Sequence, residues 1–191
     1  MAQIEVKPLA GKTIAIVATD GFEQIELTSP KEALERAGAS TKIISPKKGS
    51  IQGWKHHDKA DMFKVDLDVA SARADDFDAL LLPGGVANPD ALRTDQDVLK
   101  FVRAFFEAGK PVAAICHAPW TLIDAEVVDG RRMTSYKSLR TDLLNAGAQW
   151  VDEACVVDNG LVTSRDPNDL PAFNRKVVEE VGEGVHTGQT T

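Results

Sequence analysis

The stretch AAICHAPW, residues 113–120, is an apolar run that stops at a cysteine and continues directly into a helical pattern. A side chain held on a sharp strand-to-helix turn needs small residues two positions before and after it, and Ala114 and Ala118 meet this need. Unpaired N–H groups and the helix dipole at the start of the following helix favour a thiolate at Cys116. The stretch therefore predicts a nucleophile elbow. The alternative interpretation, a small buried hydrophobic cysteine, is open at this point.

Length and composition indicate one globular domain. The chain has 191 residues, of which 43% are hydrophobic and 27% charged. A chain of this size buries a sizeable core without needing disulfide bridges or a structural metal. Its 2 cysteines argue against a disulfide framework and for a reducing compartment. Cys155 lies in the apolar run 154–157, which predicts a buried strand residue.

Charge and hydropathy exclude several partners. The net charge is −7, from 22 basic and 29 acidic residues, and no basic stretch is long enough to follow a phosphate backbone. We expect no general nucleic-acid binding. Residues 1–8 lack the apolar core of a signal peptide, and no stretch approaches the roughly 18 apolar residues of a membrane span. The expected location is the cytoplasm, with no membrane contact.

Three continuous apolar runs predict strands that are covered on both faces by helices, as in a parallel sheet. These runs are residues 13–18, 78–82 and 111–115. Helical patterns lie between them, including one that ends near Gly38. Pro30 leaves its start open: it is either the first-turn proline after Ser29 or a kink in a longer helix from about Glu23, and we favour the longer helix. We predict an α/β sandwich of three layers with a mostly parallel central sheet. Strict alternation over residues 63–69 adds an edge hairpin, after a polar loop at 47–61.

The apolar runs end in three loops, 20–23, 84–90 and 116–117, that carry acids, glycines and the cysteine. Ligands of open parallel sheets bind beyond the carboxyl ends of the strands, so we expect these loops to share one crevice. His56, His57 and Asp58 could suggest a metal site. Neighbouring residues of an extended segment point in opposite directions, which favours a solvated loop, and we expect no metal ligands.

Four motifs resemble the PfpI family of the class I glutamine amidotransferase-like superfamily, which also includes the Parkinson-associated deglycase. They are DGFEQIEL (20–27), LPGG (82–85), AICHAP (114–119) and TSRDPNDL (163–170). The resemblance implies a flavodoxin-like domain over residues 12–182. An N-terminal extension, 1–11, and a flexible tail, 183–191, would flank this domain.

The resemblance also implies the site residues. Cys116 matches the family's nucleophile, His117 its adjacent histidine, and Glu23 an acid that hydrogen-bonds the sulfur. A carboxylate from a neighbouring subunit completes the set, and Asp90 is its best match. The loop here is one residue longer than the family pattern and has Asp where the pattern has Glu.

The chemistry of these residues can be argued separately. A carboxylate beside a thiolate is a like-charge pair, so one group stays protonated, and a buried Glu23 could then donate and accept protons. The alternative for Glu23 is an ordinary first-turn acid. His117 is either a base or a structural hydrogen-bonding residue. Gly84 and Gly85 are expected at the oxyanion or substrate site, where the N–H groups of Gly85 and His117 are donors.

Three functions fit these candidate site residues. The first is a stress-response hydrolase of reactive aldehydes or glycated groups that uses Cys116 and Glu23 without a cofactor. The second is a cysteine peptidase with Cys116, His117 and Asp90. The third is a redox sensor or stress chaperone that works through oxidation of Cys116. The expected partners are a small aldehyde or glycated protein as substrate and further copies of the chain, in a dimer or hexamer.

Overall fold

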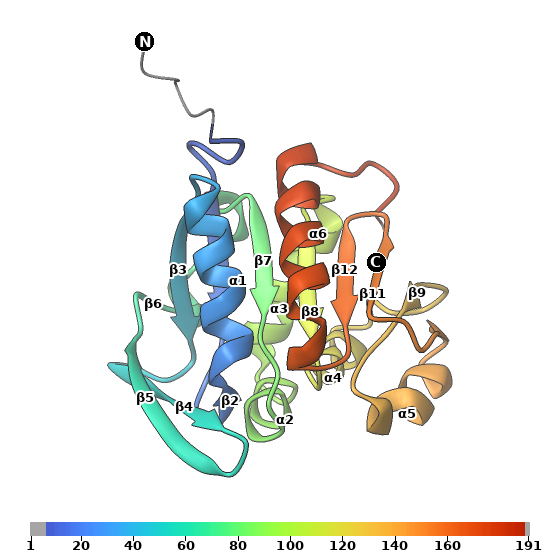
Figure 1. The fold of residues 1–191 in the computed structure, drawn as a ribbon, viewed down its shortest axis with the longest axis horizontal. Coiled ribbons are helices and arrows are strands. Elements are labelled where there is room, and N and C mark those ends of the chain that lie inside the picture. The colour runs from blue at the N-terminus through green and yellow to red at the C-terminus, as the bar shows by residue number, and fades with distance from the viewer. Residues whose placement is uncertain (1–6, 190–191) are drawn as a thin grey trace.

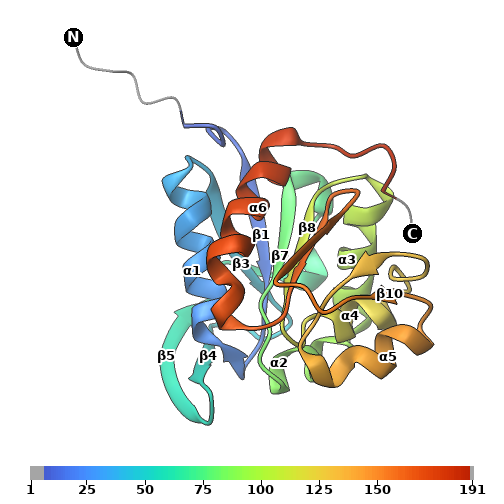
Figure 2. The same cartoon turned by 45° about the vertical axis from the view of Figure 1, so that its right-hand side comes forward.

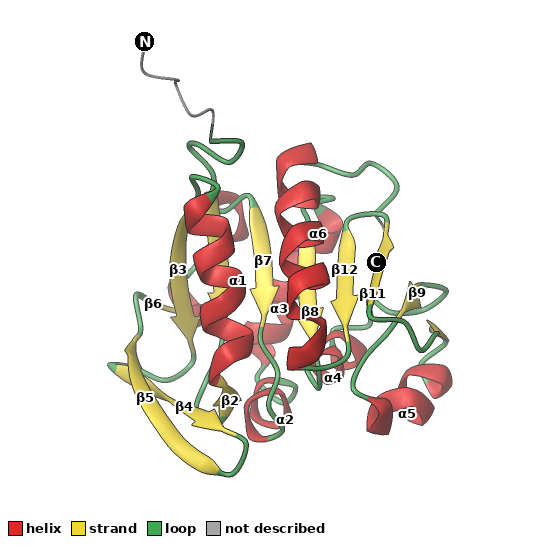
Figure 3. Ribbon diagram, viewed as in Figure 1, coloured by secondary structure: helices red, strands yellow, loops and turns green. Residues whose placement is uncertain are grey.

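A sheet of seven strands forms the centre of the computed structural model, which describes residues 7–189 (Figures 1 and 3). The strand order is β11-β12-β8-β7-β1-β3-β6, and every neighbouring pair is parallel except β11 and β12. The predicted mostly parallel sheet is confirmed. Its strands are β1 (Thr13–Val17), β3 (Ser40–Ser45), β6 (Leu67–Asp68), β7 (Ala79–Leu82), β8 (Val112–Ile115), β11 (Cys155–Asp158) and β12 (Leu161–Ser164).

Helices cover both faces of the sheet, which explains the continuous apolar strands. Ile14 and Ile16 of β1 pack into a core with α1 (Gln24–Arg36) and α6 (Leu170–Glu183). Ala15 and Val17, which point the other way, pack into a second core with α3 (Gln96–Glu107) and α4 (Pro119–Asp124). Figure 1 shows α1 and α6 in front of the sheet, and Figure 2 shows α3 and α4 on its other side. The result is the three-layer sandwich that we predicted.

Helix α1 runs without interruption through Pro30, so the longer of the two possible helices is the correct one. Its buried face contains Leu27, Pro30 and Leu34. It also contains Glu26, which is fully buried. A carboxyl group on the core face of a helix needs a specific partner, because burying an unpaired charge is costly.

The edge hairpin is present, but it begins earlier than we predicted. Strands β4 (Ser50–Lys55) and β5 (Asp58–Lys64) pair antiparallel and join β2 (Phe22–Glu23) in a separate sheet. The prediction of a polar loop over residues 47–61 was therefore wrong. Apolar residues far apart in the sequence hold the hairpin in place. The rings of Phe22 and Phe63 meet edge to face, with their centroids 5.5 Å apart.

The remaining α-helices and β-strands are short. They are α2 (Ala87–Leu92), β9 (Arg132–Met133), α5 (Arg140–Asn145) and β10 (Gln149–Trp150). Helix α6 ends at Glu183, just inside the predicted tail. Parts of the predicted extension and tail, residues 1–6 and 190–191, lie outside the described residues. No helix within residues 7–189 is long and apolar enough to cross a membrane.

Candidate active site

Cys116 lies on a strained turn between β8 and α4. Its φ is 64°, a left-handed conformation that is rare for residues other than glycine. The turn is fixed from two sides, because the Cys116 N–H donates to the Ser164 carbonyl at 3.1 Å and the Tyr136 N–H donates to the Cys116 carbonyl at 2.9 Å. The geometry is the strand-to-helix elbow that the small residues around Cys116 predict. Cys116 is buried, with 7% of the residue exposed.

The three predicted loops meet at this turn. A Cβ on Gly84 would lie 2.6 Å from the Cys116 Cβ, and a Cβ on Gly85 would lie 2.5 Å from the Gly21 carbonyl oxygen. Only glycine allows backbones to approach this closely. Asn88 stabilises the loop that follows β7, because its Nδ2 donates to the carbonyls of Pro83 and Gly84.

The acid beside the sulfur is Glu26, and the placement of Glu23 there was wrong. The Glu26 carboxyl interacts directly with the Cys116 side chain, and its Oε2 accepts from the Gly84 N–H at 3.0 Å. Its Oε1 is buried and makes no hydrogen bond among the described residues. Glu23 instead accepts from the His56 N–H at 3.0 Å and lines a separate surface pocket with residues of the hairpin.

The start of α1 explains the difference between the two acids. Glu23 is the last residue before the helix and has an extended backbone, so its side chain lies along the hairpin. Glu26, one turn later, shares the buried face with Leu27 and Pro30. Local spacing did not separate the two acids, because Glu23 and Leu27 are four positions apart just as Glu26 and Pro30 are.

Burial raises the pKa values of both Glu26 and Cys116. Burial raises the pKa of Glu26 to about 8, and the Gly84 N–H opposes that rise. Burial and a charged Glu26 also raise the pKa of the Cys116 thiol, while the N–H groups of Gly85 and His117 lower it. Two negative charges cannot coexist at this distance in a low dielectric, so at least one of the two groups stays protonated. With the proton on Glu26, both backbone N–H groups stabilise a thiolate.

His117 contacts the sulfur directly. Its Nδ1 lies 3.1 Å from the Cys116 Sγ, and its Nε2 lies 3.3 Å from the Ser138 Oγ. The ring stacks on Tyr136 with centroids 4.6 Å apart and meets Trp120 edge to face. Burial lowers the pKa of His117, which favours the neutral imidazole. A neutral ring that faces a thiol is able to accept its proton.

Asp90 is not brought to His117 within one chain. It is exposed on α2, and no hydrogen bond or ion pair joins its carboxylate to another group among residues 7–189. His56 and His57 occupy the exposed turn of the β4–β5 hairpin, as the solvated-loop interpretation predicts.

A surface pocket of about 210 Å³ adjoins His117 through Tyr136. Its other lining residues are Lys137, Asp152, Arg165 and Asp166. Arg165 is held in place by Asp152 at 2.8 Å and by Asp169 at 2.9 Å. The pocket therefore presents both cationic and anionic groups beside the imidazole.

The stability of the fold should depend on pH through Glu26. Because burial raises its pKa from 4.5 to about 8, the folded chain binds this proton more tightly than the unfolded chain. The resulting stabilisation is complete below pH 4.5 and is lost as the pH rises through about 8, at up to about 1.4 kcal/mol per pH unit. Glu26→Gln has no such proton.

Urea unfolding titrations of the wild type and of Glu26→Gln, from about pH 5 to about pH 8, measure how the stability of each depends on pH. The free energy of unfolding of Glu26→Gln should rise relative to that of the wild type as the pH increases. A constant difference across the range would show that Glu26 is already ionised in the folded chain.

Known proteins of one family match this chain over most of its length. A model of the DJ-1/PfpI family matches residues 12–180. A Bacillus subtilis protein named "Putative cysteine protease YraA" is 48% identical over 165 residues, which are 86% of this chain and 95% of that protein. DJ-1beta of Drosophila melanogaster superposes with a TM-score of 0.81 at 28% identity, over 90% of each chain. A two-domain protein of Anabaena variabilis, with DJ-1/ThiJ/PfpI-like and ferritin-like domains, matches with a TM-score of 0.83 at 32% identity, over 94% of this chain and 50% of that one.

Proposed function

Since this chain belongs to the DJ-1/PfpI family, we propose that it is a cysteine hydrolase that acts on reactive aldehydes or glycated groups through Cys116. One observation carries the proposal: the sulfur lies between the Glu26 carboxyl and the His117 Nδ1. Nucleophile, proton donor and proton acceptor are thus adjacent, as covalent catalysis requires.

The proposed reaction of an α-oxoaldehyde such as methylglyoxal begins at the aldehyde carbon. The Cys116 thiolate forms a C–S bond, and the carbonyl oxygen receives a proton from Glu26, which gives a hemithioacetal. The ionised Glu26 then removes the proton from the former aldehyde carbon while the neighbouring carbonyl oxygen takes up a proton, which gives an enediol. Glu26 returns its proton to the neighbouring carbon, the hydroxyl of the former aldehyde carbon loses its proton, and that carbon becomes a thioester. Water breaks the C–S bond and releases lactate and the thiol. The sum is methylglyoxal plus water to lactate plus a proton.

Backbone donors support the charged steps. The N–H groups of Gly85 and His117 lower the pKa of the Cys116 thiol and so favour negative charge at this position. Donors in such positions stabilise negative charge as it develops on an attacked carbonyl, typically by about 3 kcal/mol each. The buried Oε1 of Glu26, which has no partner among the described residues, is the atom able to exchange a proton with the substrate.

A peptidase is the second candidate, favoured by the contact between the His117 Nδ1 and the Cys116 Sγ at 3.1 Å and by the similarity to the protein named as a cysteine protease. In this case His117 takes the thiol proton and later passes it to the leaving amine. The mechanism needs a third group to orient the imidazole, for which Asp90 of another subunit is the candidate.

Product analysis of one preparation distinguishes the two candidates. Purified protein is incubated with methylglyoxal and, separately, with a fluorogenic peptide, and lactate and fluorophore are both measured. Lactate formation without peptide cleavage is the expected result. Peptide cleavage alone would show that the chain is a peptidase. The absence of both products would contradict both candidate functions.

A complementation experiment tests the role of Asp90 across subunits. If Asp90 acts in trans, Asp90→Asn and Cys116→Ala should each be inactive alone, yet regain activity when their subunits exchange. A mixed dimer has one site with both groups intact, so random exchange in a symmetric dimer should restore about a quarter of the wild-type activity. Asp97→Asn, an exposed first-turn acid of α3, is the matched control. Full activity of Asp90→Asn alone would exclude this role.

A further inference from the structure

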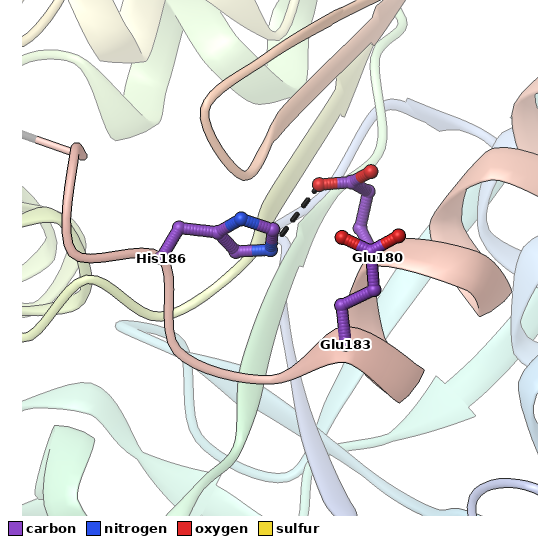
Figure 4. A group of neighbouring side chains, drawn as sticks. All are labelled: Glu180, Glu183 and His186. Carbon is purple, nitrogen blue, oxygen red and sulfur yellow. Dashed lines mark ion pairs between the residues drawn. The ribbon is translucent and has the colours of Figure 1, made fainter.

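Three potential ligand atoms meet at the end of α6, on Glu180, Glu183 and His186, and all lie within 4.8 Å of one another. Figure 4 shows both carboxylates and the imidazole turned toward the same gap. We propose that these residues bind a divalent transition-metal cation, Zn²⁺ in particular, which attaches the segment 184–189 to α6. This site is separate from the catalytic function proposed above.

The chain geometry brings the three residues together. Glu180 and Glu183 are three positions apart on α6, so they lie on one face of the helix. The helix ends at Gly184, whose φ of 86° lets the chain turn back. The turn returns the His186 ring to the helix, where its Nε2 lies 3.2 Å from the Glu180 Oε2.

Two of these atoms are buried without a satisfactory partner. Glu180 is only 7% exposed, and among residues 7–189 neither its Oε2 nor the His186 Nε2 makes a hydrogen bond of acceptable geometry. Their mutual contact at 3.2 Å is close but misaligned. Buried polar atoms are nearly always satisfied, and one cation between these two atoms would satisfy both.

The donor set indicates the class of metal. Two carboxylate oxygens and one imidazole nitrogen suit Zn²⁺ and similar transition metals, whereas Ca²⁺ and Mg²⁺ prefer sites made of oxygen alone. Tetrahedral ligands about 2.1 Å from Zn²⁺ lie about 3.4 Å from each other. Glu180 and His186 are close to this spacing, and the ligand atom of the exposed Glu183 lies within 4.8 Å of both. Two carboxylates also balance the charge of the cation.

Backbone contacts hold the histidine in position before any metal binds. The His186 N–H donates to the Gly109 carbonyl at 2.7 Å, and the Gln189 N–H donates to the His186 carbonyl at 3.0 Å. A Cβ on Gly160 would lie 2.8 Å from the His186 ring, so the segment sits tightly on the β11–β12 turn. Gly109 precedes β8, and Cys116 follows it. The site is therefore at the opposite end of that strand from the sulfur.

Calorimetric titration of the chelator-treated full chain with ZnCl₂ tests the proposal. Because Cys116 and His117 also offer zinc ligands, the titration is done on both the wild type and Cys116→Ala. We expect one equivalent of Zn²⁺ to bind in Cys116→Ala. Glu183→Gln and His186→Ala, made in that background, should each weaken binding at least about tenfold. Glu179→Gln and His57→Ala, which alter an exposed acid of α6 and a distant exposed histidine, should not.

A second readout reports on the segment itself. Zn²⁺ should slow amide hydrogen exchange at residues 185–189 in Cys116→Ala, and this protection should disappear in Glu183→Gln. Glu183 is exposed, so its isosteric replacement leaves the fold intact. The proposal is overturned if Cys116→Ala binds no Zn²⁺, if Glu183→Gln and His186→Ala bind it as tightly as their parent, or if Zn²⁺ leaves the exchange of 185–189 unchanged.

Discussion

Cys116→Ser should lower the rate of lactate formation from methylglyoxal by roughly 10⁴-fold or more, as the loss of a covalent nucleophile typically does. Serine keeps the shape of the side chain, so the elbow and the contact with His117 should persist. What is lost is the thiolate, because an alcohol beside Glu26 does not ionise near neutral pH. Lactate is measured over hours for both proteins and corrected for the uncatalysed reaction, which gives the ratio of the wild-type rate to the Cys116→Ser rate.

Cys155→Ser is the matched control for this result. Cys155 lies at the start of β11 and is half-buried, and burial raises the pKa of its thiol. Its replacement should leave the rate unchanged within about twofold, since its thiol interacts with Ser164 and not with Glu26 or His117. If Cys116→Ser retained most of the activity, the reaction would not pass through a bond to this sulfur.

Glu26→Gln should lower kcat/KM by roughly 10²- to 10⁴-fold, the usual contribution of a positioned proton donor and acceptor. The amide oxygen of glutamine can still accept from the Gly84 N–H, so the local fold is preserved. It cannot pass a proton to the substrate oxygen or remove one from carbon. Steady-state kinetics with methylglyoxal measure the loss, which should fall mainly on kcat.

Glu23→Gln separates the two acids of the same segment. Its carboxylate only accepts from the His56 N–H at the hairpin, a contact that a glutamine oxygen reproduces. Activity should stay within about threefold of the wild type. The reverse result, an inactive Glu23→Gln beside an active Glu26→Gln, would contradict the assignment of the acid in this structure.

Much of the fold was predictable from local sequence. The continuous apolar runs that became β1, β7 and β8 predicted buried parallel strands, because a strand covered on both faces has no polar side. The ends of such strands share one edge of the sheet, so the loops at Gly84 and Cys116 could be expected to meet. The small residues beside Cys116 indicated its elbow in the same way.

The hairpin and the acid required the tertiary structure. Residues 50–64 have weak strand patterning, and they form β4 and β5 because β2 and the Phe22 ring provide a surface for them. The choice between Glu23 and Glu26 depended on where α1 begins, since a shift of one residue rotates every side chain by about 100°. Helix boundaries are the least certain feature of a sequence pattern.

The sequence by itself determined that Cys116 ends a buried strand and starts a helix, since that depends on neighbours within a few positions. Tertiary structure decided which groups surround its sulfur: Glu26, the Gly85 N–H and the His117 ring. It also brought His186 back to Glu180. The physical reason is that proton transfer and metal binding depend on distances of a few ångströms between segments far apart in the chain, which only the packing of the elements sets.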